Sequence, residues 1–166
     1  ALDAYLEGKS IRVFKRQGVL SEEEIQARHS IMMDNYTMKI QIEARVISDQ
    51  ALNAVIPAAV KYQNRLIQNV QGMLQIGLEE EARPLKETVR SIAMHISKTN
   101  GLCLEMNKAL AEGEELVEVR ERGIFFCVQI KERFFEEIRR HIDRLESMID
   151  DADWPLPKYW ELLFLR

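Results

Sequence analysis

Apolar residues recur at helical spacing along most of the chain, beginning after a clear helix start. Ser21 and Glu24 form a capping box, in which the Ser21 hydroxyl accepts from the Glu24 amide and the Glu24 carboxylate reaches back to the Ser21 amide. No turn signal follows until Gly72 and Gly77. The pattern therefore predicts one very long helix over residues 21–76, on the order of 80 Å at 1.5 Å per residue.

The apolar stripe of this helix repeats at eleven residues, as from Tyr36 to Ile47, so it stays on one face of a nearly straight rod. Pro57 lacks a backbone donor and presses on the carbonyl of Asn53, which predicts a kink at this point. The alternative is two helices that meet at Ile56. No residue near Pro57 has loop chemistry, which favours the kink.

A second long helix is predicted over residues 84–111, after an acidic linker at 77–83. Pro84 suits the first position of a helix, where a backbone donor is not needed. Gly101 lies on the polar side and costs the helix about 1 kcal/mol relative to alanine without ending it. The apolar stripe alternates four- and three-residue steps, a heptad seam that packs at a shallow angle against a neighbour. The seam contains Leu85, Val89, Ile92, Ile96, Thr99, Cys103, Met106 and Leu110.

A turn at Gly113 then reverses the chain, and a third long helix over 114–150 completes an antiparallel hairpin. Two short helices are expected within residues 1–20, closed by Gly8 and Gly18, which can take positive φ. The segment 151–166 has two prolines and several aromatic residues, and we expect it to pack against the bundle and to end in a turn of helix over Trp160–Phe164.

These elements predict a single all-α domain over 1–166. The architecture is an elongated antiparallel bundle of three long helices, the first kinked at Pro57, with short N- and C-terminal helices. With 7 glycines and 4 prolines in 166 residues, the composition also favours helix. A chain of this length buries enough surface for one core.

The net charge of −4 argues against a protein that binds nucleic acid by neutralising phosphates. No apolar run reaches the roughly 18 residues of a spanning helix, so no membrane contact is expected and the chain is interpreted as cytoplasmic. Cys103 and Cys127 lie in apolar helical patterns without a CxxC motif, which favours buried, reduced thiols.

A search for chemistry predicts no catalytic, cofactor-binding or metal-binding residue in this chain. None of the three histidines has a carboxylate three residues before it, as carboxylate-bridged metal bundles require. Glu137 and His141 are one helical turn apart and could share a ligand, although a surface pair is the simpler interpretation. His29 and His95 are interpreted as isolated, structural or exposed residues. Nucleotide-binding glycine motifs are absent from the sequence.

Two segments, from Lys39 and from Asp150, are distinctive enough to indicate a family, and the lead-in segment from Val13 is similar to the same family. They read VFKRQGVLSEEEIQARHSI from Val13, KIQIEARVISDQALNAVIPAAVKYQNRLIQNV from Lys39, and DDADWPLPKYWELLFLR from Asp150. Together they resemble the C-terminal region of type III glutamine synthetases, and the similarity extends over nearly the whole chain. Two positions depart from the expected pattern: Ala54 stands where a histidine is expected, and Trp160 where a basic residue is usual.

The resemblance implies a parent enzyme that joins ammonia to glutamate with ATP and Mg or Mn ions. It also implies that the catalytic residues lie in a preceding domain and that this chain is the C-terminal piece of the enzyme. The enzyme would form a homo-oligomer. Its partners would be the catalytic domain and neighbouring subunits. The physical pattern agrees, because phosphoryl transfer needs carboxylates and cations around one cavity, whereas these helices offer core seams. Two alternatives stay open: a self-contained adaptor or sensor bundle, and a metal-dependent bundle enzyme.

Overall fold

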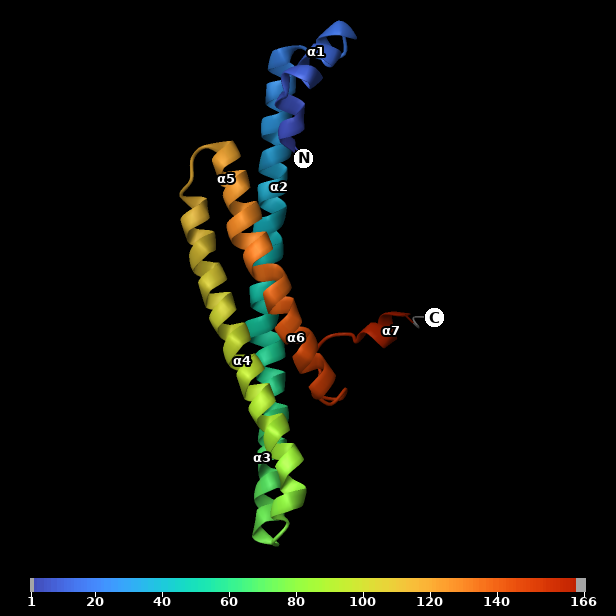
Figure 1. Cartoon of the computed structure of the whole chain (residues 1–166), viewed down its shortest axis with the longest axis vertical. Coiled ribbons are helices and arrows are strands. Elements are labelled where there is room, and N and C mark those ends of the chain that lie inside the picture. The colour runs from blue at the N-terminus through green and yellow to red at the C-terminus, as the bar shows by residue number, and fades with distance from the viewer. Residues whose placement is uncertain (1, 164–166) are drawn as a thin grey trace.

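The computed structural model describes residues 2–163, with the side chains of residues 159 and 160 excepted. These residues form helices and no strand, so the predicted all-α class is confirmed. A long rod and a returning helical hairpin run side by side over the middle of the molecule (Figure 1). At one end the rod and the first helix of the hairpin extend beyond the second helix of the hairpin and form a two-helix arm.

The rod consists of α2 (Glu22–Gln50), a π-helical segment η2 (Ala51–Val55) and α3 (Ile56–Gln75). Backbone angles stay right-handed helical where the segments join, so the chain continues as one helix rather than two. The disturbance predicted at Pro57 takes the form of the π turn that precedes it. A wider turn accommodates the proline ring and the unbonded carbonyl without a break in the helix.

The capping box at the start of α2 is confirmed. The Glu24 amide donates to the Ser21 hydroxyl at 3.1 Å, and the Ser21 amide donates to the Glu24 carboxylate at 2.7 Å. Each bond satisfies a donor that would otherwise have no partner within the helix. The capping box therefore fixes the residue at which the long rod begins.

The predicted linker at 77–83 is wrong, because α4 (Glu79–Glu114) begins directly after the turn and Pro84 lies inside it. Three glutamates occupy its first turn, where the helix dipole favours negative charge. Gly77 turns the chain with φ of +81°, a conformation that glycine adopts without a steric penalty. The side chain of Pro84 faces solvent, so the interruption lies on the outer side of the helix.

The turn predicted at Gly113 is also wrong. The helix runs on to Glu114, and the chain reverses over residues 115–118. Gly113 is buried, and a Cβ atom there would lie 2.7 Å from the Phe126 ring and 2.8 Å from the Phe125 ring. The glycine is required by close packing, not by turn geometry.

The third long helix consists of α5 (Val119–Phe125), a π-helical segment η3 (Phe126–Phe135) and α6 (Glu136–Met148). Its large buried side chains recur every four residues, a spacing that drifts around a regular α-helix of 3.6 residues per turn. The wider π turn offsets this drift, so the side chains stay on the line that faces α2 and α4. They are Phe126, Ile130, Phe134 and Ile138.

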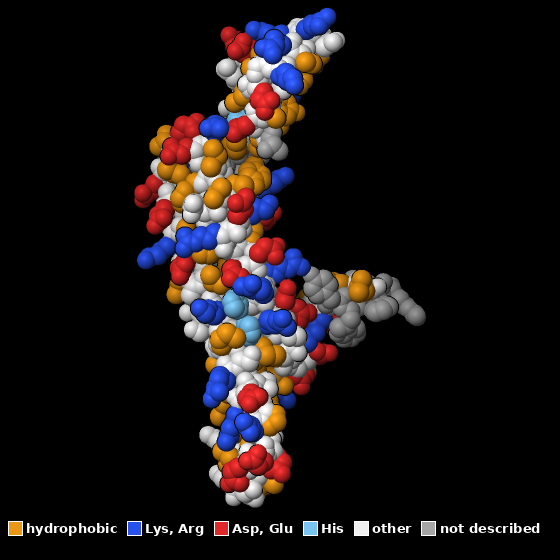
Figure 2. All heavy atoms as spheres, in the orientation of Figure 1, with side chains coloured by type: hydrophobic (Ala, Val, Ile, Leu, Met, Phe, Trp, Pro, Cys, Tyr) orange, Lys and Arg blue, Asp and Glu red, His pale blue; other side chains and the backbone are white. Residues whose placement is uncertain are grey.

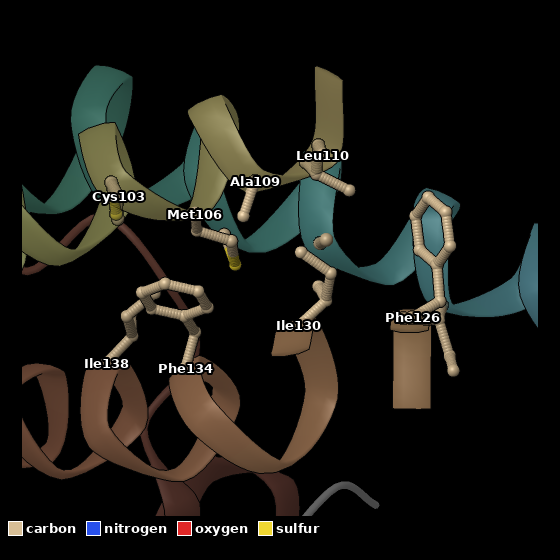
Figure 3. Close-up of a cluster of buried hydrophobic side chains, with 11 residues drawn as sticks. Cys103, Met106, Ala109, Leu110, Phe126, Ile130, Phe134 and Ile138 are labelled. Carbon is tan, nitrogen blue, oxygen red and sulfur yellow. The ribbon is translucent and has the colours of Figure 1, made fainter. Parts of the chain in front are cut away.

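The main core lies where this helix, α2 and α4 meet. In Figure 3 the labelled side chains of α4 point toward those of η3 and α6, with α2 behind them. Cys103 and Met106 on the predicted heptad seam are both fully buried. A second cluster surrounds Trp154, which is 8 % exposed and packs with residues of α3, α4 and α6.

The two ends of the chain follow the predictions in part. Short helices form at η1 (Leu2–Leu6) and α1 (Gly8–Arg16), and Gly18 closes α1 with φ of +62° as expected. Gly8 instead begins α1. In the tail Trp154 packs down, whereas α7 (Tyr159–Leu163) projects from the bundle (Figure 1). The predicted end of that helix at Phe164 lies outside the described residues.

Candidate functional site

The α2 helix has an apolar stripe on each of two opposite faces. One faces the core, and the other, which we call the outer face, lies in solvent within the described structure. Its residues are spaced seven, four and four apart and therefore share one side of the helix. They are Ile31, Met38, Ile42 and Val46, with exposed fractions of 60, 56, 55 and 47 %. A helix that is apolar on both sides is typical of one that is covered on both sides.

A groove of about 600 Å³ borders the outer face between α2 and α5. Met32 and Tyr36 form the α2 side of the groove, while Ile124 and Cys127 form the other side. A second hollow of about 460 Å³ shares Met32 with the groove and includes Ile31. The outer face and the groove therefore form one surface.

Gly123 brings α5 close enough to α2 to close the floor of the groove. A Cβ atom at this position would overlap the sulfur of Met33, and Met33 is buried. On the same two helices, Arg122 donates to Asp34 at 2.7 Å. The groove thus has a fixed width set by a close backbone approach and an ion pair.

The two thiols are in different environments, contrary to the prediction that both are buried. Both cysteines are free. Cys103 is fully buried, and burial raises the pKa of its thiol to about 11. Cys127 is only half-buried at the groove, where its sulfur accepts a hydrogen bond of 3.3 Å from the Tyr36 hydroxyl. That hydrogen bond is the main reason that the pKa of Tyr36 rises to about 12.

His95 is not isolated as predicted, because it contacts His141 across α4 and α6. Their Nδ1 atoms are 2.8 Å apart, so one ring donates and the other accepts. Figure 2 shows histidine side chains at the surface near the middle of the molecule. Burial and the neighbouring charges of His141 and Arg144 lower the pKa of His95. Glu137 pairs with Arg140 instead of sharing a ligand with His141.

His29 is likewise not isolated. It is buried on α2 and lies 3.2 Å from Asp3 of η1, and Asp3 also accepts two hydrogen bonds from Arg120 of α5. The Arg120 guanidinium is the first cause that lowers the pKa of Asp3. These three side chains connect η1, α2 and α5 and so have a structural role.

The described residues contain no group of three histidine, cysteine, aspartate or glutamate side chains that could hold a metal ion. The His95–His141 pair supplies two nitrogens, and Arg144 next to it disfavours a cation. No such cluster within residues 2–163 therefore offers ligands for the metal ions that the family resemblance implies. Over the same residues, no helix is long and apolar enough to cross a membrane.

Fold and surface together define an all-helical domain whose described residues include an exposed apolar surface along α2. Its residues 1–74 match the family model of the glutamine synthetase C-terminal domain. Over its whole length the chain is 37 % identical to a glutamine synthetase of Bacteroides fragilis and covers 23 % of that protein. Over 95 % of its length it is 27 % identical to a type-3 glutamine synthetase of Dictyostelium discoideum, of which it covers 22 %. The chain is thus similar to glutamine synthetases over its whole length, and its first 74 residues are similar to their C-terminal domain.

The predicted resemblance to glutamine synthetases is thus confirmed, and the chain spans less than a quarter of the length of these relatives. Sequence reasoning missed the outer face because Ile31 to Val46 lie within a helix whose core stripe already explains its apolar content. One signal was present: these four residues share a side of α2 that the eleven-residue repeat leaves out. The contact between His95 and His141 has no sequence signal, because the two residues are 46 positions apart.

Proposed function

We propose that this chain is the C-terminal helical domain of a type III glutamine synthetase and acts as a packing element. The enzyme makes glutamine from glutamate, ammonia and ATP, and the chain's outer face binds the remainder of that enzyme or a neighbouring subunit. The type-3 relative of Dictyostelium discoideum supports the subtype. The observation that carries the packing role is the uncovered second apolar stripe of α2.

The catalytic chemistry lies outside this chain in this proposal. ATP and the divalent ions need carboxylates and cations around one cavity, and we assign them to another part of the enzyme. The groove beside α2 is instead mostly apolar in its lining, which suits protein contact. We further infer a cytoplasmic enzyme that forms a homo-oligomer.

A substitution on the outer face of the full-length enzyme tests the packing role. Ile42→Glu places a charge where the partner excludes water, and a buried unpaired charge costs several kcal/mol. The matched control is Ile76→Glu at the tip of the α3–α4 arm, which replaces an isoleucine that is 74 % exposed. The measurements are particle mass by light scattering and ATP-dependent glutamine formation.

We expect Ile42→Glu to lower the assembled fraction by more than about tenfold, with a parallel loss of activity, whereas Ile76→Glu leaves both unchanged. Full assembly and activity of Ile42→Glu would contradict the packing role. A full-length protein that forms no glutamine from glutamate, ammonia and ATP would contradict the enzyme assignment separately.

A further inference from the structure

The surface along α2 combines two shapes that complement each other. The outer face, Ile31 to Val46, is a ridge of four apolar side chains, and the α2–α5 groove beside it is a hollow of about 600 Å³. An amphipathic helix laid into an apolar groove is a common mode of protein recognition. A surface that carries both a ridge and a groove can bind a second copy of itself about a twofold axis.

We propose that the occupant of the outer face is the α2 helix of a second copy of this chain, packed antiparallel. The inference rests on the packing role proposed above and names its partner. Ile31 and Val46, which end the ridge, are equidistant from a point between Met38 and Lys39, and Met38 lies next to that point with Ile42 one turn beyond it. A twofold axis at that point places Ile31 opposite the partner's Val46.

Charges at the ends of the ridge favour this register. Arg28 lies one turn before Ile31, and Asp49 lies one turn after Val46; both side chains are exposed. The same axis places Arg28 opposite the partner's Asp49, because Arg28 lies three residues before Ile31 and Asp49 lies three residues after Val46. Symmetry repeats the pair at the other end of the ridge. A parallel arrangement would instead bring Arg28 beside the partner's Arg28, and like charges in contact disfavour binding.

Association of the 166-residue chain tests the proposal directly. Sedimentation velocity of the unmodified chain is expected to show a monomer–dimer equilibrium in the range up to about 100 μM, as for a small interface. Ile42→Glu should weaken the dimer at least about tenfold, whereas the control Ile76→Glu should not. Circular dichroism verifies that each variant keeps its helical content.

Charge reversal tests the register. Arg28→Asp alone and Asp49→Arg alone should each weaken the dimer, because each places like charges opposite one another. The double variant restores opposite charges and should recover most of the affinity, which is the signature of direct coupling. Two single losses that simply add in the double variant would overturn the register.

A disulfide near the axis gives an independent test of the antiparallel arrangement. In a Cys127→Ser background, Met38→Cys places two thiols next to the twofold axis and should form a covalent dimer on mild oxidation. Ile76→Cys, on the exposed arm, should form far less. Equal cross-linking of the two variants would overturn the antiparallel arrangement.

A chain that stays monomeric over the whole concentration range would overturn this inference. The proposed packing role is tested separately, by assembly of the full-length enzyme with Ile42→Glu. If that assembly fails while the 166-residue chain is monomeric, the outer face binds another part of the enzyme. If the chain dimerises as proposed and the full-length variant assembles normally, the dimer has no part in the enzyme.

Discussion

Two glycines of α4 should respond in opposite directions to the same substitution. Gly113 is buried, and an added Cβ would lie within 2.8 Å of the rings of Phe125 and Phe126. Gly101, on the same helix, has no atom within 4 Å of that position. Neither glycine has positive φ, so the helical backbone accepts alanine at both sites.

The magnitudes follow from two competing effects. Alanine in place of glycine stabilises a helix interior by about 1 kcal/mol, and Gly101→Ala should gain most of this. At Gly113 the gain is smaller near the helix end, while overpacking against two rings destabilises by about 1–3 kcal/mol. The Phe126 ring is fully buried and has little room to move. Gly113→Ala should therefore lose about 1–2 kcal/mol of unfolding free energy.

Urea denaturation followed by circular dichroism measures both variants against the unmodified chain. The midpoint should rise for Gly101→Ala and fall for Gly113→Ala, with an unchanged slope in each case. A Gly113→Ala variant as stable as Gly101→Ala would show that the rings relax freely. The close approach of α4 to the start of η3 would then not be a constraint on the fold.

Three further predictions concern titratable groups. The pKa of His95 is lowered from 6.5, so at this residue the folded state binds fewer protons than the unfolded state. Stability should therefore fall as pH drops below about 6.5, and urea titrations of His95→Gln should show a weaker dependence on pH. Lys61 and Arg65 lower the pKa of Asp153, so the ionised Asp153 should stabilise the fold fully above pH 3.8 and lose this effect as pH falls below it. Acid-unfolding curves of Asp153→Asn should lack that contribution. An unchanged curve would contradict the ion pairs. Cys127 should react with a thiol reagent well before Cys103, whose pKa is about 11, and equal labelling rates in the folded chain would argue against the burial described.

The helices themselves were predictable because their signals are local. The capping box at Ser21 and the heptad seam of α4 depend on residues a few positions apart, and both are confirmed. Features that depend on other helices were not predictable. A glycine at position 113 indicates a turn from the sequence alone, but in the structure the close contact with Phe126 is what requires a glycine there.

Helix boundaries near proline were predicted wrongly for a related reason. Pro84 suits a first helical position, yet the glutamates before it stabilise an earlier start, and the exposed side of α4 tolerates the missing hydrogen bond. At Pro57 the long helix likewise continues through the proline, with a π-helical segment before it in place of a break. Local preference gives more than one solution at such sites, and the surrounding packing selects between them.

The central claim is that the outer face of α2 is covered in the assembled enzyme, and a structure of the full-length protein tests it most directly. Cryo-electron microscopy at side-chain resolution would show whether Ile31, Met38, Ile42 and Val46 contact another polypeptide. We predict that all four lose most of the exposure they have in the 166-residue chain. An assembled, active enzyme in which these side chains remain in solvent would contradict the account.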